Sequence, residues 1–170
     1  GAFITLYAAY REPDVFSKVM VLSPAVWFGE SGGAWLSNNR LINYISSHPL
    51  SQESKFFIYI GTNEWNGRTL RLPGMTYPKV WVSGVNAVKA AIESHPNSEV
   101  YLVTNSGGIH SPTSWRWWVD DAITWLFADS AELPDSLPPA DGSRADQYEI
   151  QVSTTNRFTT LPYGGLTLDG

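Results

Sequence analysis

One of only three histidines in the 170-residue chain lies in a short glycine-rich segment. This segment, Asn105 to Ser111 (NSGGIHS), follows an apolar run and places His110 one residue after the pair Gly107-Gly108. A histidine in a loop after a buried strand can reach over a sheet edge and still rotate, which is the placement that general-base catalysis needs. An ordinary surface histidine, or one that caps a backbone group, would suit the same position. The position alone leaves both interpretations open.

A carboxylate occupies a comparable place after another apolar run. Glu64 lies in the loop segment Gly61 to Gly67 (GTNEWNG), which follows the run Lys55 to Ile60. A carboxylate there could orient an imidazole and stabilise its charged form, as the third member of a catalytic triad does. A solvated loop carboxylate is the alternative, and it is the commoner fate of an isolated glutamate. If this strand end supplies a triad acid, Glu64 is the only local choice.

A nucleophile is the member that the sequence does not show. Four loop serines qualify by residue type alone: Ser23, Ser31, Ser106 and Ser111. None lies in a Gly-x-Ser-x-Gly turn, whose small residues let a strand turn sharply into a helix and expose the serine oxygen. The chain has no cysteine, which excludes disulfides, a cysteine nucleophile and thiolate zinc sites.

The other two histidines have a structural interpretation. His48 and His95 both lie in the tripeptide Ser-His-Pro at the end of a predicted helix. A histidine at that place interacts favourably with the carbonyl groups of the helix C-terminus. We therefore predict that neither belongs to a reactive site.

Alternating helix and strand patterns surround these residues. Helical spacing predicts helices over residues 1–10, about 34–47, 78–94 and 112–128, and apolar runs predict strands over 18–22, 55–60 and 99–104. This alternation indicates an α/β fold with a parallel sheet and helices packed on its faces. Reactive groups of such a sheet lie at the carboxyl ends of its strands, here the loops 23–33, 61–75 and 105–111.

The composition changes along the chain. Residues 1–130 read as one α/β unit, residues 131–146 as a proline-rich linker, and residues 147–170 as a β-like tail or the start of a second domain. Three strands are few for such a sheet, and the opening helix has no strand before it. We therefore expect further strands upstream of this chain.

Composition limits the classes of partner. The chain is 43% hydrophobic and 16% charged, with a formal net charge of -5. Nucleic acids and anionic membranes both require a basic footprint, so neither is expected as a partner. No apolar run is long enough to span a membrane, and no signal peptide is visible. The low lysine content and the abundance of Ser, Thr, Asn and Trp lean towards a secreted or periplasmic protein without deciding the compartment.

The first part of the chain resembles a known family. Segments Gly1 to Tyr10 (GAFITLYAAY), Glu12 to Phe16 (EPDVF) and Val21 to Trp27 (VLSPAVW) are similar to the stretch after the nucleophile elbow in the putative-esterase family of α/β-hydrolases. That family includes esterase D-like enzymes, ferric-enterobactin esterases, and feruloyl and acetylxylan esterases of carbohydrate esterase family one. Gly1 matches the last glycine of the elbow, so the resemblance implies a nucleophile two residues before Gly1.

Two further segments extend the resemblance to about residues 1–128. Gly61 to Glu64 (GTNE) is similar to the family's Gly-Thr-x-Asp/Glu, which implies that Glu64 is the triad acid. Gly107 to His110 (GGIH), followed by Trp115, is similar to the family's Gly-Gly-x-His and Trp, which implies that His110 is the triad base. The chain departs from the family pattern in lacking the nucleophile and the upstream oxyanion loop, and in having Glu where many relatives have Asp.

The resemblance implies the C-terminal half of an α/β-hydrolase domain that acts as a serine carboxylic-ester hydrolase through an acyl-enzyme. No metal or organic cofactor is needed, and the chain alone is predicted to be inactive. The expected substrate is a small-molecule or polysaccharide-linked ester, for which Trp27, Trp35 and Trp65 are candidate binding residues, although core packing is the commoner fate of Trp. A non-catalytic binding or scaffold module with the same fold is the alternative.

Overall fold

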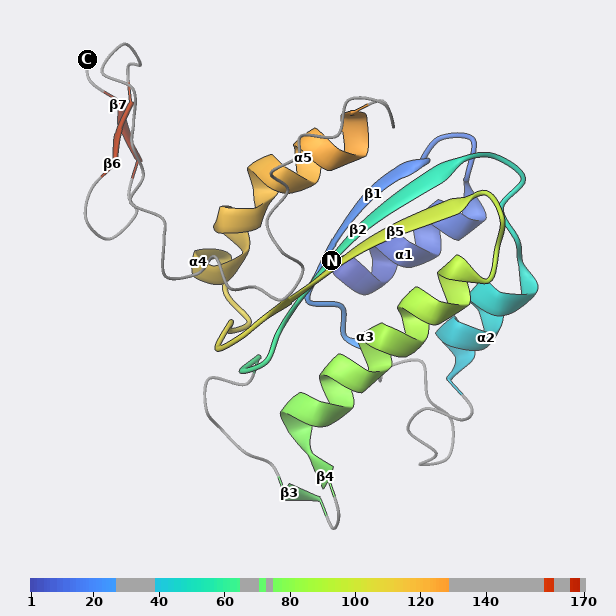
Figure 1. Ribbon diagram of the computed structural model, residues 1–170, viewed down its shortest axis with the longest axis horizontal. Coiled ribbons are helices and arrows are strands. Elements are labelled where there is room, and N and C mark those ends of the chain that lie inside the picture. The colour runs from blue at the N-terminus through green and yellow to red at the C-terminus, as the bar shows by residue number, and fades with distance from the viewer. Residues whose placement is uncertain (27–38, 65–70, 73–74, 129–157, 161–165, 169–170) are drawn as a thin grey trace.

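A computed structural model describes six stretches of the chain: residues 1–26, 39–64, 71–72, 75–128, 158–160 and 166–168 (Figure 1). For residues 71–72, 75–80, 158–160 and 166–168 the description covers the backbone alone.

The centre of the structure is a parallel sheet of three strands, β1 (Lys18–Leu22), β2 (Ser54–Gly61) and β5 (Ser98–Asn105), in the order β1-β2-β5. The strands β2 and β5 end side by side, because Gly61 is paired with Asn105. The strand β1 ends slightly earlier, with Leu22 opposite Tyr59. The three strands therefore deliver their following loops to one edge of the sheet.

Helices cover both faces of this sheet. The helices α1 (Ala2–Arg11), α2 (Arg40–Ser47) and α3 (Tyr77–Glu93) lie on one face, and α5 (Val119–Phe127) lies on the other (Figure 1). The expected α/β fold, a parallel sheet flanked by helices as in an α/β-hydrolase, is thus confirmed.

The central strand supplies both hydrophobic cores. Phe56, Ile58 and Ile60 belong to the core under α1, α2 and α3. Phe57 and Tyr59 belong to the core under α5. Successive side chains of a strand point to opposite faces, so an uninterrupted apolar run suits a strand that is buried on both sides. This burial explains why the sequence pattern of β2 could be recognised so easily.

Two predicted helices differ from the structure at their starts or in their continuity. The helix predicted from about residue 34 begins at Arg40, because Asn39 has an extended backbone and its side chain accepts hydrogen bonds from the N–H groups of Leu41 and Ile42. The helix predicted over 112–128 is divided into α4 (Pro112–Trp115), a 3-10 turn (Arg116–Trp118) and α5. The tighter turn ends at Trp118, whose ring is buried against Tyr59.

Short hairpins lie outside the central sheet. The strands β3 (Arg71–Leu72) and β4 (Met75–Thr76) pair antiparallel within a stretch predicted as a polar loop. Strands of two residues are too short to leave a periodic signal in the sequence. In the tail, β6 (Phe158–Thr160) pairs antiparallel with β7 (Leu166–Leu168). The predicted linker 131–146 lies outside the described residues, as does most of the tail 147–170.

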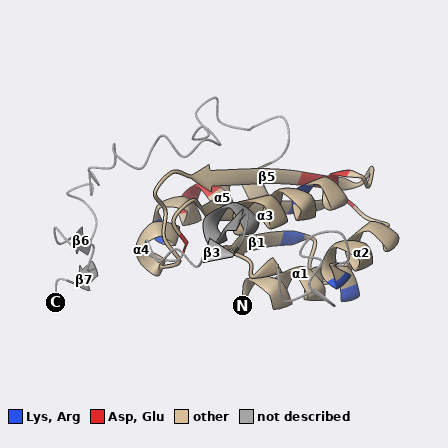
Figure 2. Cartoon of the chain, turned by 90° about the horizontal axis from the view of Figure 1, so that it is seen from below, with Lys and Arg blue, Asp and Glu red and all other residues tan. Residues whose placement is uncertain are grey.

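The charged residues of the described elements are dispersed. In Figure 2 the blue Lys and Arg and the red Asp and Glu are spread over several elements, and α5 carries two neighbouring acids, Asp120 and Asp121. Within the described stretches, no three His, Asp or Glu side chains gather as they would around a metal ion, and no helix has the length and apolarity to cross a membrane.

Two buried tyrosines differ in how their hydroxyl groups are paired. Burial raises the pKa of both Tyr10 and Tyr59. Tyr59 Oη accepts a hydrogen bond of 2.9 Å from Asn105 Nδ2, whereas Tyr10 Oη is buried without a partner among the described residues. A buried polar group without a partner costs stability, while a paired one contributes to it.

We expect Tyr10→Phe to leave the free energy of unfolding unchanged or raise it by about 1 kcal/mol, and Tyr59→Phe to lower it by about 1–2 kcal/mol, because only the second change strands a buried donor. Urea unfolding of the natural protein, followed by far-UV circular dichroism, measures both. The matched Tyr-to-Phe pair removes the same atom from two buried rings. An equal loss for both variants would contradict the difference in pairing.

Candidate active site

The two predicted triad residues meet at the carboxyl edge of the sheet. Glu64 follows β2 by three residues and His110 follows β5 by five. Glu64 Oε2 lies 2.8 Å from His110 Nδ1. The structure therefore brings together an acid and a histidine that are 46 residues apart in sequence.

The Glu64 carboxylate is buried, with 2% of the residue exposed. Its Oε1 accepts two hydrogen bonds of 2.6 Å, one from the N–H of Gly61 and one from the hydroxyl of Ser23. Burying a charged group is costly unless it is paired and hydrogen-bonded. An ionised carboxylate only accepts hydrogen bonds, and three donors converge here on its two oxygens.

The His110 ring has a buried partner on one side and is open on another. Its side chain is 43% exposed although Glu64 is not. When Nδ1 donates its proton to Glu64, Nε2 is left with a lone pair, because a neutral imidazole carries one proton. The ring can then accept a proton at Nε2, while the carboxylate stabilises the charge that forms.

Two tryptophan rings flank His110. The centroid of Trp115 lies 5.1 Å from that of His110 in an edge-on arrangement, and the centroid of Trp81 lies 5.5 Å away and is tilted. Each indole N–H donates to the turn after β1: Trp115 Nε1 to Ser23 Oγ at 2.9 Å, and Trp81 Nε1 to the carbonyl of Pro24 at 3.0 Å. The turn Ser23-Pro24 therefore accepts a hydrogen bond from each of the two tryptophans that flank His110.

Ser23 has a strained backbone. Its φ is 49°, and it is the only non-glycine residue with a positive φ among those described. The left-handed conformation costs an L-residue about 1–2 kcal/mol, and such strain is concentrated at functional sites. A serine with this φ after a strand shares two features with a nucleophile elbow. Its hydroxyl is, however, bonded to Glu64 and Trp115, and the residue is 2% exposed.

The remaining serines that qualified by type do not contact His110 through any hydrogen bond that the structure records. Ser106 is exposed, Ser111 caps α4 by accepting from the N–H of Thr113, and Ser31 lies outside the described residues.

The acid and histidine loops are joined directly by three hydrogen bonds. The N–H of Thr62 donates to the carbonyl of Asn105, the N–H of Asn63 donates to the carbonyl of Gly108, and the N–H of Gly107 donates to Thr62 Oγ1, at 2.8–2.9 Å. Close approach requires a glycine: a Cβ on Gly61 would lie 2.2 Å from the carbonyl oxygen of Gly108. These contacts place Glu64 and His110 within hydrogen-bond distance.

An open depression of about 470 Å³ borders the histidine. It is formed by the start of α1, the end of β1 and the two residues His110 and Trp115. The residues that line it are Gly1, Ala2, Phe3, Thr5, Met20, Leu22, Ser23, Ala25, His110 and Trp115. Gly1 is the N-cap of α1, so the positive end of this helix and the histidine face the same depression.

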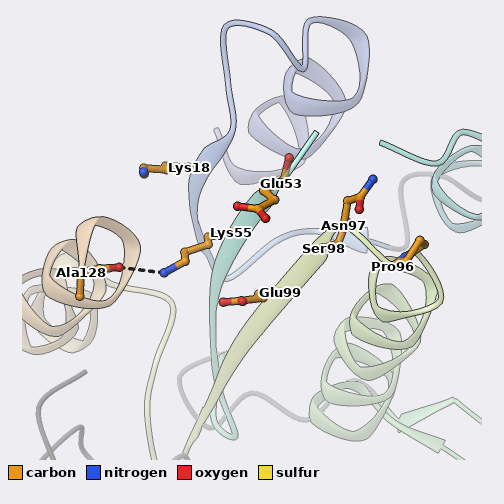
Figure 3. Close-up of a pocket in the computed structure, with 9 residues that line it drawn as sticks. Lys18, Glu53, Lys55, Pro96, Asn97, Ser98, Glu99 and Ala128 are labelled. Atoms are coloured by element: carbon orange, nitrogen blue, oxygen red, sulfur yellow. Dashed lines mark hydrogen bonds between the residues drawn. The ribbon is translucent and has the colours of Figure 1, made fainter. Parts of the chain in front are cut away.

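A second depression of about 280 Å³ lies at the opposite ends of the strands (Figure 3). Lys18, Lys55, Glu53 and Glu99 line it, so its charges are balanced. Lys55 Nζ donates to the carbonyl of Ala128 at 2.9 Å and lies over the ring of Trp125. These contacts attach the end of α5 to the sheet, which is a structural role.

The other two histidines lie apart from this site. His48 Nδ1 lies 2.8 Å from the carbonyl oxygen of Tyr44, in the helix that His48 ends. His95 is buried, and its Nε2 lies 2.9 Å from the carbonyl oxygen of Ile45. Both meet carbonyl groups of α2, as a structural histidine does.

Sequence reasoning missed three contributors to the site. Trp81 lay within the helix predicted over residues 78–94 and was not a candidate, Ser23 was a candidate only as a nucleophile, and Trp115 was named only as part of a family motif. No local signal reveals these contacts, since Ser23 and Trp115 are 92 residues apart. The candidate substrate-binding residues Trp27, Trp35 and Trp65 lie outside the described residues.

Comparison with models of protein families gives a match over most of the chain. The family model described as "Putative esterase" matches residues 1–127, which include both Glu64 and His110. Neither the curated proteins nor the solved structures contain a significant match to this chain.

Gly61→Ala should disturb the site more than Gly107→Ala. The new Cβ at position 61 meets backbone, so we expect a loss of about 2–3 kcal/mol in the free energy of unfolding and a separation of the two loops. At Gly107, where φ is +75°, an added Cβ would have no atom within 4 Å, so the cost is about 1 kcal/mol of backbone strain alone. Urea unfolding ranks the two variants, and the reverse order would contradict the close contact.

Proposed function

The chain belongs to this esterase family, and from that premise we propose that it is a serine carboxylic-ester hydrolase that works through an acyl-enzyme. The observation that carries the proposal is the 2.8 Å contact between His110 Nδ1 and the buried Glu64 carboxylate, beside an open depression. This is the acid–base half of a catalytic triad. Glu serves as the acid in some triads, where Asp is commoner.

The nucleophile of this proposal is a serine two residues before Gly1. Its Oγ attacks the ester carbonyl carbon while its proton passes to His110 Nε2. The tetrahedral intermediate collapses, the bond to the alcohol oxygen breaks, and the departing alcohol takes the proton from Nε2. A water molecule then attacks the acyl-enzyme with the same histidine as base, which releases the acid and restores the serine. Glu64 holds the imidazole in the Nδ1–H tautomer throughout.

The start of α1 supports the charge that develops on the carbonyl oxygen. The backbone N–H of the residue before Gly1 follows the serine and would donate to the oxyanion, as in the nucleophile elbow. The N-terminus of α1 adds partial positive charge at the same place. Because Gly1 and His110 border one depression, a carbonyl bound there lies between the helix start and the base.

The lining of this depression bears on the acyl group. Phe3, Met20, Leu22 and Trp115 contribute most of its large side chains, and all four are apolar. Such a lining suits an ester with an apolar or aromatic portion next to the carbonyl, as a feruloyl ester has. Small-molecule and polysaccharide-linked esters both offer such groups.

We expect His110→Ala to lower kcat/KM for p-nitrophenyl esters by about 10²- to 10⁴-fold in the natural protein, because the general base is lost. Glu64→Gln should lower kcat by a similar factor of about 10²- to 10⁴-fold with little change in KM, because an amide can hold the wrong tautomer. Steady-state kinetics on folded protein measure both effects.

His48→Ala and Glu93→Gln are the matched controls. Each makes the same chemical change at an exposed position away from the site, where His48 bonds to the end of α2 and Glu93 pairs with Lys89, and each should retain the original kcat/KM. Residues 1–170 expressed alone should hydrolyse none of these esters, because they supply the acid and the base without the nucleophile. Full activity in His110→Ala would contradict the proposal. An absence of esterase activity in the wild-type natural protein would favour a binding or scaffold module.

A further inference from the structure

We infer that Ser23 and Trp115 are positioning residues which, through Glu64, set the tautomer of His110. The inference extends the proposed function, because it concerns how the same acid–base pair is prepared. It rests on one continuous chain of contacts: Trp115 Nε1 to Ser23 Oγ at 2.9 Å, Ser23 Oγ to Glu64 Oε1 at 2.6 Å, and Glu64 Oε2 to His110 Nδ1 at 2.8 Å.

The direction of every hydrogen bond in this chain follows from the first. An indole N–H can only donate, so Trp115 requires Ser23 Oγ to accept. The serine has one proton of its own, which then points to Glu64 Oε1. That oxygen also accepts from the N–H of Gly61. Ser23 and Gly61 therefore both donate to Oε1, and Oε2 of the carboxylate remains to accept a hydrogen bond from His110.

The acceptor at Oε2 decides which ring nitrogen carries the proton. His110 Nδ1 must donate to it, so the neutral ring holds its proton at Nδ1 and its lone pair at Nε2. Without the serine proton, Oε1 keeps one donor, and the carboxylate can rotate about its last torsion. The indole group of Trp115 thus influences the histidine over two intervening side chains.

The backbone fixes the serine hydroxyl in this place. The N–H of Ser23 still donates to the carbonyl of Tyr59 at 2.8 Å, which continues the pairing of β1 with β2. The left-handed φ of 49° then turns the chain at Pro24, whose carbonyl accepts from Trp81. Because Ser23 is 2% exposed, water does not compete for its hydroxyl.

Trp115 also contacts the ring whose tautomer it sets. Its indole packs edge-on against the imidazole, with 5.1 Å between the ring centroids, while its N–H donates a hydrogen bond to Ser23 Oγ. The residue therefore acts on His110 by packing and by hydrogen bonding. Trp115→Phe separates the two effects, because a phenyl ring keeps much of the packing and removes the donor.

The test uses Ser23→Ala, Trp115→Phe and the double variant in the natural protein. Nitrogen-15 NMR of the histidine rings reports the tautomer of His110 without any substrate. We expect a dominant Nδ1–H tautomer in the wild type and a mixture of tautomers in each variant. In kinetics on p-nitrophenyl esters, kcat should fall roughly tenfold, the loss of one hydrogen bond, while KM is unchanged. The double variant should resemble Ser23→Ala, because both changes break one chain of contacts.

Three controls separate positioning from structural damage. Ser47→Ala removes an exposed hydroxyl that bonds to two carbonyls of α2 and to His48 Nδ1, away from the site, and should alter neither the tautomer of His110 nor kcat. Trp118→Phe replaces a buried indole, whose N–H has no partner among the described residues, with a smaller ring, so it should lower stability through lost packing without changing the tautomer. Ser23→Gly adopts the left-handed φ readily but lacks the hydroxyl, so it should behave like Ser23→Ala.

The outcomes distinguish this inference from the proposed function. An unchanged Nδ1–H tautomer in folded Ser23→Ala and Trp115→Phe overturns the inference, whatever the activity. A wild-type tautomer in Ser23→Gly together with a mixed one in Ser23→Ala also overturns it, because the backbone rather than the hydroxyl would then matter. A tautomer shift in a protein that hydrolyses no ester supports the inference and defeats the proposed function.

Discussion

The carboxylate of Glu64 is the charge around which the carboxyl edge of the sheet is organised. It is buried, and a buried charge is tolerated only when hydrogen bonds replace the water that it has lost. The three donors that replace water come from different parts of the chain: Ser23 after β1, Gly61 at the end of β2, and His110 after β5. Satisfying one carboxylate therefore draws together the ends of all three strands.

The backbone makes this convergence possible. Parallel strands end at a common edge, and the register that pairs Gly61 with Asn105 brings the acid and histidine loops side by side. The loops then share hydrogen bonds, and the absence of a side chain at Gly61 allows the carbonyl of Gly108 to approach. Local geometry, rather than the flexibility of long side chains, sets the distance between Glu64 and His110. Such preorganisation is what a general base with a fixed tautomer requires.

The sequence allowed prediction of the features that depend on local patterns. Strands β1, β2 and β5 were recognisable because each contains an apolar run that packs in the cores, and the boundaries of α1 and α3 followed from helical spacing. The start of α2 was predicted too early, at about residue 34, because helical spacing alone does not reveal that the side chain of Asn39 caps the helix. The break between α4 and α5 was missed because a 3-10 turn preserves most of the helical spacing.

The site was predictable only in its two titratable members. Glu64 and His110 could be identified because they follow strands and lie in short recognisable motifs. The supporting contacts of Ser23, Trp81 and Trp115 could not, because each joins residues that are distant in sequence. A tryptophan on an apolar helix stripe has the same local pattern whether it packs in a core or against a histidine.

The central claim is that the described chain supplies the acid and base for a serine that precedes α1. Fluorophosphonate labelling of the natural protein, followed by peptide mapping of the labelled residue, tests it most directly. We predict a label on a serine two residues before Gly1, and its loss in His110→Ala. A protein that takes up no label, or that is labelled at Ser23 or any other serine, would contradict the claim.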